Sequence, residues 1–164
     1  MERIVCFEPV LPPEAKILIL GTVPSVKSLE TGFYYGHPQN AFWRILSEVF
    51  GTERPVTIPQ KIGLLTDNGI ALWDTVNSCE REGSLDSAIR DAVPNAYALV
   101  RERCPGIRRV LLNGKTAANL FTRYRDGAFA NAEILVMPST SPAYTLSYEK
   151  KLAVWREALR FTEE

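Results

Sequence analysis

The sequence predicts an α/β fold, namely a three-layer α/β/α sandwich around a central four-stranded parallel sheet. Four short runs are rich in Ile, Leu and Val, and helical patterns lie between them. Continuous apolar runs are typical of strands covered on both faces of a parallel sheet. Strands that alternate with helices need right-handed crossovers, which place helices on both faces. We expect one domain over residues 1–164, because a chain of 164 residues with 46% hydrophobic content can bury one substantial core.

The elements follow in order along the chain. Strands are predicted at residues 17–20, 70–73, 110–112 and 134–137. The helix at 40–50 has an apolar stripe and is followed by Gly51 as a C-cap. A helix is expected over 84–92, with Ser84 as N-cap and Leu85 facing inward, and further helices over 95–103, 116–124 and 147–161. Residues 51–63 form the longest expected loop, because Pro55 and Pro59 interrupt it.

Charge alone gives no indication of a partner, since 19 basic residues balance 19 acidic ones. The C-terminal half is nevertheless net basic, and seven of its side chains could form a surface for phosphates: Arg101, Arg103, Arg108, Arg109, Lys115, Arg123 and Arg125. The alternative is an ordinary solvated surface with ion pairs.

Cysteine and histidine usage argues against a metal centre. Cys6, Cys79 and Cys104 stand far apart, and His37 is the single histidine, so the spacing fits neither disulfides, an iron–sulfur cluster nor a zinc site. We therefore expect no metal and no cofactor. The charged start of the chain and the absence of a long apolar run predict a cytoplasmic protein with no membrane segment, and we expect a monomer.

The segment after the first strand has the composition of a binding pocket. In open α/β sheets, ligands bind beyond the carboxyl ends of the strands. Gly21 to Ser28, with Val23 and Ser25, and then residues 31–43 combine Gly, Pro, Ser, aromatic and amide side chains. This composition indicates a pocket for a flat ligand that forms hydrogen bonds. Asn40 either caps the following helix or acts in that pocket.

Two further loops follow the third and fourth predicted strands. Asn113-Gly114-Lys115 offers an amide that can donate and accept, which suits the edge of a nucleobase, although Asn-Gly is also a common turn. Residues 138–145, Pro-Ser-Thr-Ser-Pro-Ala-Tyr-Thr, offer hydroxyl and backbone N–H groups for phosphates, although such a loop can be structural only.

Together these motifs resemble the uracil-DNA glycosylase superfamily, and within it the hypoxanthine-DNA (deoxyinosine) glycosylase branch. The resemblance covers residues 17–161 and rests on Gly-x-x-Pro-Ser, Tyr-Gly-His-Pro-x-Asn-x-Phe-Trp, Asn-Gly-Lys and Pro-Ser-Thr-Ser-Pro-Ala. It implies a monofunctional, metal-free enzyme of base-excision repair. Such an enzyme flips a deaminated base out of DNA and hydrolyses its N-glycosidic bond, leaving an abasic site.

The resemblance also implies roles for individual residues. Asn40 would be catalytic and position water through its side-chain oxygen, because Val23 stands where relatives carry a water-directing side chain. The last motif lacks the histidine of the uracil enzymes, which favours hypoxanthine over uracil. The base would be bound by Tyr35, His37, Asn113, Phe42, Gly21 and Val23, with core packing as the alternative for Phe42 and a local hydrogen bond for His37. DNA would be held by Ser25, Lys115, Ser139, Thr140, Ser141, Pro142 and Tyr144. Pro142 or Tyr144 would fill the gap left by the flipped base, and Lys115 would touch phosphate or only begin a helix.

Other functions stay open at this point. The chain could be a uracil- or mismatch-specific glycosylase, a non-catalytic lesion- or nucleotide-binding module, or a hydrolase of free nucleosides. A Ser–His–Asp hydrolase would use Ser25 or Ser139 with His37 and Asp74, but the sequence lacks the Gly-x-Ser-x-Gly motif. The sequence does not separate hypoxanthine, uracil and xanthine, nor single-stranded from double-stranded DNA.

Overall fold

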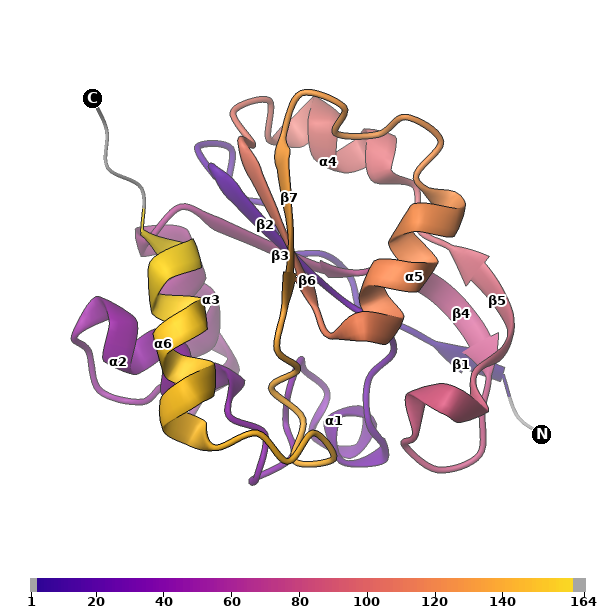
Figure 1. The fold of residues 1–164 in the computed structure, drawn as a ribbon, viewed down its shortest axis with the longest axis horizontal. Coiled ribbons are helices and arrows are strands. Elements are labelled where there is room, and N and C mark those ends of the chain that lie inside the picture. The colour runs from indigo at the N-terminus through magenta and orange to yellow at the C-terminus, as the bar shows by residue number, and fades with distance from the viewer. Residues whose placement is uncertain (1–2, 161–164) are drawn as a thin grey trace.

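The predicted parallel sheet is present and lies at the centre of the molecule (Figure 1). A computed structural model describes residues 3–160. The sheet has the order β3-β2-β6-β7, with β2 at Ile17–Gly21, β3 at Ile70–Asp74, β6 at Arg109–Asn113 and β7 at Glu133–Met137. All three pairings are parallel, and each of the four predicted strands is confirmed to within one residue at either end. In both central strands, β2 and β6, all residues except Arg109 are buried, as expected for strands covered on both faces.

Helices cover both faces of this sheet, which makes the three expected layers. Figure 1 shows α2 (Phe42–Phe50), α3 (Ile58–Asp67) and α6 (Tyr148–Leu159) on one side and α4 (Tyr97–Arg103) and α5 (Lys115–Tyr124) on the other. Alternate strand residues point to opposite sides: Ile19 lies in the core beneath the first group, whereas Leu18 and Leu20 lie in the core beneath the second. The fold therefore fixes which strand residues can reach the layer between sheet and helices.

Several helix ends follow from local sequence. Gly51 is the left-handed C-cap of α2, as predicted, and Ser147 accepts a hydrogen bond from Lys150 N at the start of α6. Helix α3 lies where the sequence suggested a loop. Its start is a capping box between Thr57 and Gln60, and Pro59 sits in the first turn, where a missing N–H costs nothing. Proline there marks a helix start rather than a loop.

The helix predicted over 84–92 is wrong. Only Asp86–Ala88 form a short 3₁₀ turn, and the chain then enters β5 (Arg90–Pro94). Residues Ile89 and Ala92 do pack inward, but against a small cluster around Val76 and Cys79 rather than along a helical stripe. Strand pairing with β4 (Val76–Glu80) satisfies the backbone in place of helical hydrogen bonds.

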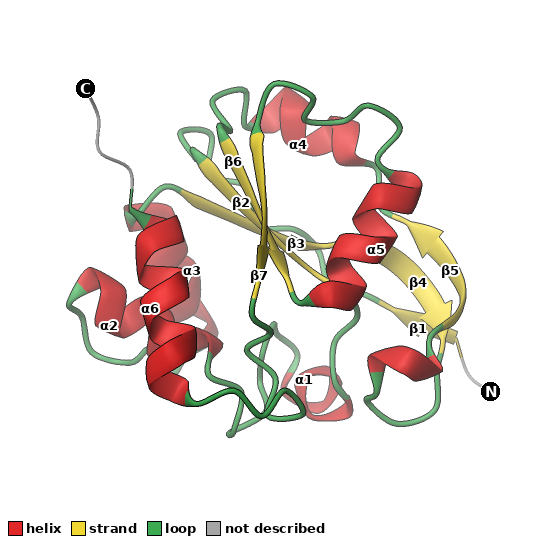
Figure 2. Cartoon of the chain, in the orientation of Figure 1, coloured by secondary structure: helices red, strands yellow, loops and turns green. Residues whose placement is uncertain are grey.

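A second, smaller sheet was not predicted. It has the order β1-β4-β5 and is antiparallel, with β1 at Arg3–Val5 (Figure 2). The chain enters it directly after β3, with only Thr75 between β3 and β4. A short helix α1 (Val26–Thr31), capped by Ser25, follows β2 at the same end of the molecule. These additions surround the carboxyl ends of the parallel strands.

Candidate active site

The carboxyl ends of the parallel strands form the base of a cavity of about 330 Å³. Gly21 ends β2 opposite Asp74 at the end of β3, and Asn113 ends β6 opposite Met137 at the end of β7. The first three of these residues line the cavity. Its walls come from residues 114–116 at the start of α5 and from four loops: residues 22–28 after β2, residues 34–40 before α2, residues 84–87 between β4 and β5, and residues 139–144 after β7. The site therefore lies where an open α/β sheet is expected to bind its ligand.

Asp74, Tyr35 and Gly21 meet at the base of the cavity. A Cβ atom built on Gly21 would lie 2.7 Å from both Asp74 Oδ1 and the Tyr35 hydroxyl oxygen, so only glycine fits there. Asp74 is 3% exposed, and its Oδ2 makes no hydrogen bond within the part of the chain that the structure describes. Burial raises the pKa of the Asp74 carboxyl well above its usual range, and nearby Asp86 adds to this effect. A protonated Asp74 can both donate and accept a hydrogen bond inside the cavity.

A buried polar network surrounds that carboxyl. Thr22 donates a hydrogen bond of 2.8 Å to Asp86 Oδ1, although burial still raises the pKa of Asp86. Arg81 is buried and donates to the carbonyls of Pro24 at 2.6 Å and Gly83 at 2.8 Å. Its positive charge opposes the rise in the pKa of both carboxyls. The arginine thus joins the segment after β4 to the loop after β2.

Tyr35 is held rigidly beside this network. Its ring stacks on Phe42 with centroids 4.1 Å apart, and its backbone φ is +53°, which is uncommon for a tyrosine. Burial raises the pKa of the Tyr35 hydroxyl, so that group is a neutral donor, although its interaction with the Asn113 side chain acts in the opposite direction. Among residues 3–160 its oxygen has no hydrogen-bond partner of good geometry. Strained backbone and an unpartnered polar atom in a cavity wall are typical of functional positions.

Asn40 lines the cavity and also caps the first N–H group of α2, although the N-cap residue itself is Ala41, one position later than predicted. Its Oδ1 accepts a hydrogen bond of 3.0 Å from Phe42 N, while its own N–H donates to the His37 carbonyl at 2.9 Å. The next residue, Ala41, donates to the Thr140 carbonyl, so the loop before α2 is joined to the loop after β7. The cap fixes the orientation of the Asn40 amide and leaves its Nδ2 and the second lone pair of Oδ1 available. Capping and a role in the cavity are therefore compatible.

The Asn113 side chain makes two hydrogen bonds to Thr140 in the loop after β7. Its Nδ2 donates to Thr140 Oγ1 and its Oδ1 accepts from Thr140 N, both at 3.0 Å. An amide has two donor hydrogens and two acceptor lone pairs, so one of each is left for the neighbouring Tyr35 hydroxyl or for a ligand. The side chain accordingly positions the loop after β7 as well as lining the cavity.

The loop after β7 uses most of its backbone donors internally. The N–H groups of residues 140, 141, 143 and 144 all donate within the loop or to Asn113. The expectation that backbone N–H groups there hold phosphates is wrong for these four, which leaves the hydroxyls of Ser139, Thr140 and Ser141 as donors. Lys151, 4% exposed, supports the loop from α6 by donating to the Ser141 carbonyl at 3.0 Å.

Most of the predicted site residues gather around this one cavity. Its lining includes Gly21, Val23, Ser25, Tyr35, Asn40, Asn113, Lys115, Ser139, Thr140, Ser141 and Tyr144. Three do not line it. Phe42 is 0% exposed and packs in the core beneath Tyr35. His37 lies over a separate shallow depression and accepts a local hydrogen bond from Gln39 N, and Pro142 is exposed outside the cavity.

The predicted basic surface lies mainly at the wrong end of the molecule. Arg108 and Arg109 stand at the start of β6, whereas the cavity lies at the strand ends. Arg101, Arg103, Arg123 and Arg125 lie at the C-terminal ends of α4 and α5, near the same far edge. Arg109 is paired with Glu133 at 2.6 Å. Of the seven side chains, only Lys115 borders the cavity.

Asp74 and Asp86 were missed as pocket residues, although Asp74 was considered for a hydrolase triad, and Thr22 was included only as part of the segment 21–28. The signal for Asp74 was present, since it follows a buried strand just as Asn113 does. Asp86 carried no such signal, because it fell inside the helix expected over 84–92. Ser25 and Ser139 both line the cavity but His37 does not, so the hydrolase triad is not assembled.

The fold and cavity together define an α/β protein that binds its ligand at the ends of a four-stranded parallel sheet. The sequence matches the family model of the uracil DNA glycosylase superfamily over residues 8–162, and the chain belongs to that superfamily. A Methanosarcina barkeri protein named Hypoxanthine DNA glycosylase is 32% identical over 155 residues, covering 94% of this chain and 96% of that protein. A Methanosarcina acetivorans protein of the same name is 33% identical with the same coverage.

A solved structure supports the fold directly. A Methanosarcina acetivorans protein, determined by solution NMR and proposed to be a uracil DNA glycosylase, superposes with a TM-score of 0.84 at 32% identity. The match covers 97% of this chain and 98% of that one. Within residues 3–160, no helix is long and apolar enough to cross a membrane.

Proposed function

We propose that this protein is a monofunctional DNA glycosylase that flips hypoxanthine out of deoxyinosine-containing DNA and hydrolyses its N-glycosidic bond. The proposal is supported by the names of the two relatives, which match nearly the whole chain. The observation that carries it is Asn40, an amide of fixed orientation in the wall of a cavity at the strand ends. The product would be an abasic site, which places the enzyme in base-excision repair.

Hydrolysis of the bond develops positive charge on the sugar and negative charge on the departing base. A neutral amide is a poor general base, so Asn40 would act by positioning the attacking water through the free lone pair of Oδ1. Its cap to Phe42 N removes the need to order the side chain during the reaction. Preorganised polar groups of this kind contribute about 3–4 kcal/mol to lowering a barrier.

The base of the cavity suits a lactam edge, in which a ring N–H lies beside a carbonyl. A protonated Asp74 can accept from the N–H and donate to the carbonyl oxygen, while Asn113 offers one further donor and one acceptor. Tyr35 would stack on the base with the face not covered by Phe42. A cavity of about 330 Å³ lies in the range of small-molecule sites.

Two features favour hypoxanthine over uracil. Val23 is buried in the small apolar cluster and cannot direct water. The only histidine, His37, lies outside the cavity, so no imidazole is available to stabilise a uracil anion. We also propose that the enzyme is a single domain over residues 1–164, and that it acts as a cytoplasmic monomer without metal or cofactor.

A panel of labelled duplexes tests this function. Each duplex carries one damaged base, hypoxanthine, uracil or xanthine, and alkali reveals abasic sites after single-turnover reaction. We expect hypoxanthine to be released clearly faster than uracil, and equal or reversed rates would refute the assignment. Free deoxyinosine is the control for a nucleoside hydrolase, and tight binding of the hypoxanthine duplex without release would indicate a non-catalytic module.

A further inference from the structure

Leu85 is a large apolar side chain held in solvent at the rim of the cavity. It is 62% exposed and yet lines the cavity, on the segment between β4 and β5. The sequence predicted that this residue faces inward from a helix over 84–92, but the local backbone is extended, with φ −75° and ψ 130°. An exposed leucine alone is ordinary, so its surroundings decide whether it has a role.

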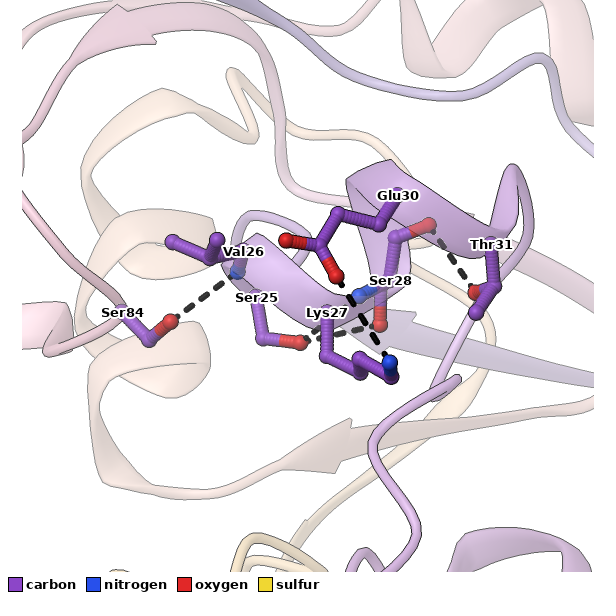
Figure 3. A network of polar contacts seen from close by, with 7 residues as sticks. All are labelled: Ser25, Val26, Lys27, Ser28, Glu30, Thr31 and Ser84. Carbon is purple, nitrogen blue, oxygen red and sulfur yellow. Dashed lines mark hydrogen bonds and ion pairs between the residues drawn. The ribbon is translucent and has the colours of Figure 1, made fainter.

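The neighbours on both sides of Leu85 are tied to the loop after β2. Ser84 Oγ accepts a hydrogen bond of 2.9 Å from Val26 N at the start of α1 (Figure 3). Asp86 Oδ1 accepts one of 2.8 Å from Thr22 Oγ1. Behind them, Arg81 donates to the Gly83 and Pro24 carbonyls. These bonds hold the backbone of residues 83–86 while the Leu85 side chain between them contacts water.

A second large side chain stands at another part of the rim. Tyr144 is 47% exposed and lines the cavity from the loop after β7. Strands β3 and β7 are the two edges of the parallel sheet, and the Leu85 segment continues from the β3 side. In Figure 1 the pink segment between β4 and β5 and the orange loop after β7 lie at the same end of the molecule, on either side of α1 in this view.

We propose that Leu85 is a wedge that enters the base stack of duplex DNA beside the flipped nucleotide, on the side away from Tyr144. Apolar side chains such as Leu insert between base steps and unstack them, which a double-stranded substrate requires and a single strand does not. A fixed backbone makes such insertion cheaper, because no loop has to be ordered on binding. This inference rests on the proposed function for its substrate.

Truncation of Leu85 separates a wedge from a wall of the base pocket. For Leu85→Ala we expect single-turnover excision of hypoxanthine to fall about tenfold or more on a duplex and to change less than about twofold on a single strand. Leu85→Phe, which keeps a large apolar group, should retain duplex activity. The matched control is Val93→Ala on β5, which truncates another exposed aliphatic residue, 46% exposed and outside the cavity lining, and should affect neither substrate.

Equal losses of excision rate on duplex and single strand would overturn the proposal, because they would make Leu85 a wall of the base pocket. An unchanged rate on both substrates would overturn it as well. A duplex with 2-aminopurine next to the lesion gives an independent readout. The parental protein should raise its fluorescence by unstacking and Leu85→Ala should not. If the parental protein releases no hypoxanthine, the proposed function fails, but the fluorescence comparison still decides the wedge: an equal signal from the two proteins overturns it.

Discussion

Replacing Asn40 tests whether its side chain is structural or catalytic, because its position allows both roles. Its Oδ1 caps α2 through Phe42 N at 3.0 Å, and the side chain also lines the cavity. Loss of a cap costs about 1 kcal/mol, which lowers Tm by roughly 2–4 °C in a domain of this size. With a total stability of about 5–15 kcal/mol, more than about 99% of Asn40→Ala would stay folded.

Instability therefore cannot account for a large loss of rate. If the amide positions water, Asn40→Ala should lose at least about a hundredfold in single-turnover excision, equivalent to about 2.7 kcal/mol of barrier. Substrate binding should be retained. The measurements are the melting temperature, duplex affinity and excision rate of the same preparation.

Asn40→Asp is the matched variant, because a carboxylate caps as well as an amide and suits a helix N-terminus. It keeps the acceptor for Phe42 N but replaces the Nδ2 donor with an oxygen. A catalytic role predicts a stable protein with an altered rate or base preference. If both variants excise hypoxanthine at the parental rate, Asn40 is only a cap and the proposed site is wrong.

Three further outcomes follow from the cavity. Because burial raises the pKa of Asp74, the folded protein holds a proton that the unfolded chain releases above about pH 3.8, so this group lowers stability as pH rises. Asp74→Asn should therefore raise Tm at pH 8 and keep the excision rate within about tenfold of the parental rate, whereas Asp74→Leu should lower that rate about a hundredfold. Gly21→Ala should lower the free energy of unfolding by about 1–3 kcal/mol in a denaturant titration and block excision, because its Cβ would lie 2.7 Å from Asp74 and Tyr35. Unchanged stability and an unchanged excision rate would contradict the packing described. Duplex affinity should fall with salt. Lys115→Ala should reduce the slope of log affinity against log salt concentration by about 1, while Arg101→Ala leaves it unchanged; equal effects of the two variants would mean that the arginines far from the cavity also contact phosphate. Excision should survive a chelator.

The parallel sheet and its helices could be predicted because burial on both faces leaves a strong pattern in the sequence. Residues such as Ile19 and Leu72 have apolar residues directly before and after them in their strands. The same rule pointed to Gly21 and Asn113 as cavity residues. It applied equally to Asp74, but the raised pKa of that carboxyl comes first from its burial and then from Asp86, twelve residues away in sequence, and both conditions arise only on folding.

The antiparallel sheet could not be predicted because its strands are short and half exposed. In β5 four of the five residues are exposed, so neither alternation nor a continuous apolar run marks it. Its stability comes from pairing with β4, a contact between chain segments that local propensity does not contain. The basic surface was predicted from the charge of the C-terminal half alone, although Arg108 and Arg109 precede a predicted strand and so belong at the end of the sheet opposite the cavity.

The two sheets divide the site into parts that can change separately. Strand register fixes the backbone positions of Gly21, Asp74 and Asn113 at the base of the cavity. The segment between β4 and β5 is attached instead by a few side-chain hydrogen bonds from Ser84, Asp86 and Arg81. This segment forms no part of the parallel sheet, so its sequence can change without altering the pairing of those strands. If Leu85 acts as proposed, changes at this exposed position would alter how duplex DNA is held while leaving the residues at the strand ends in place.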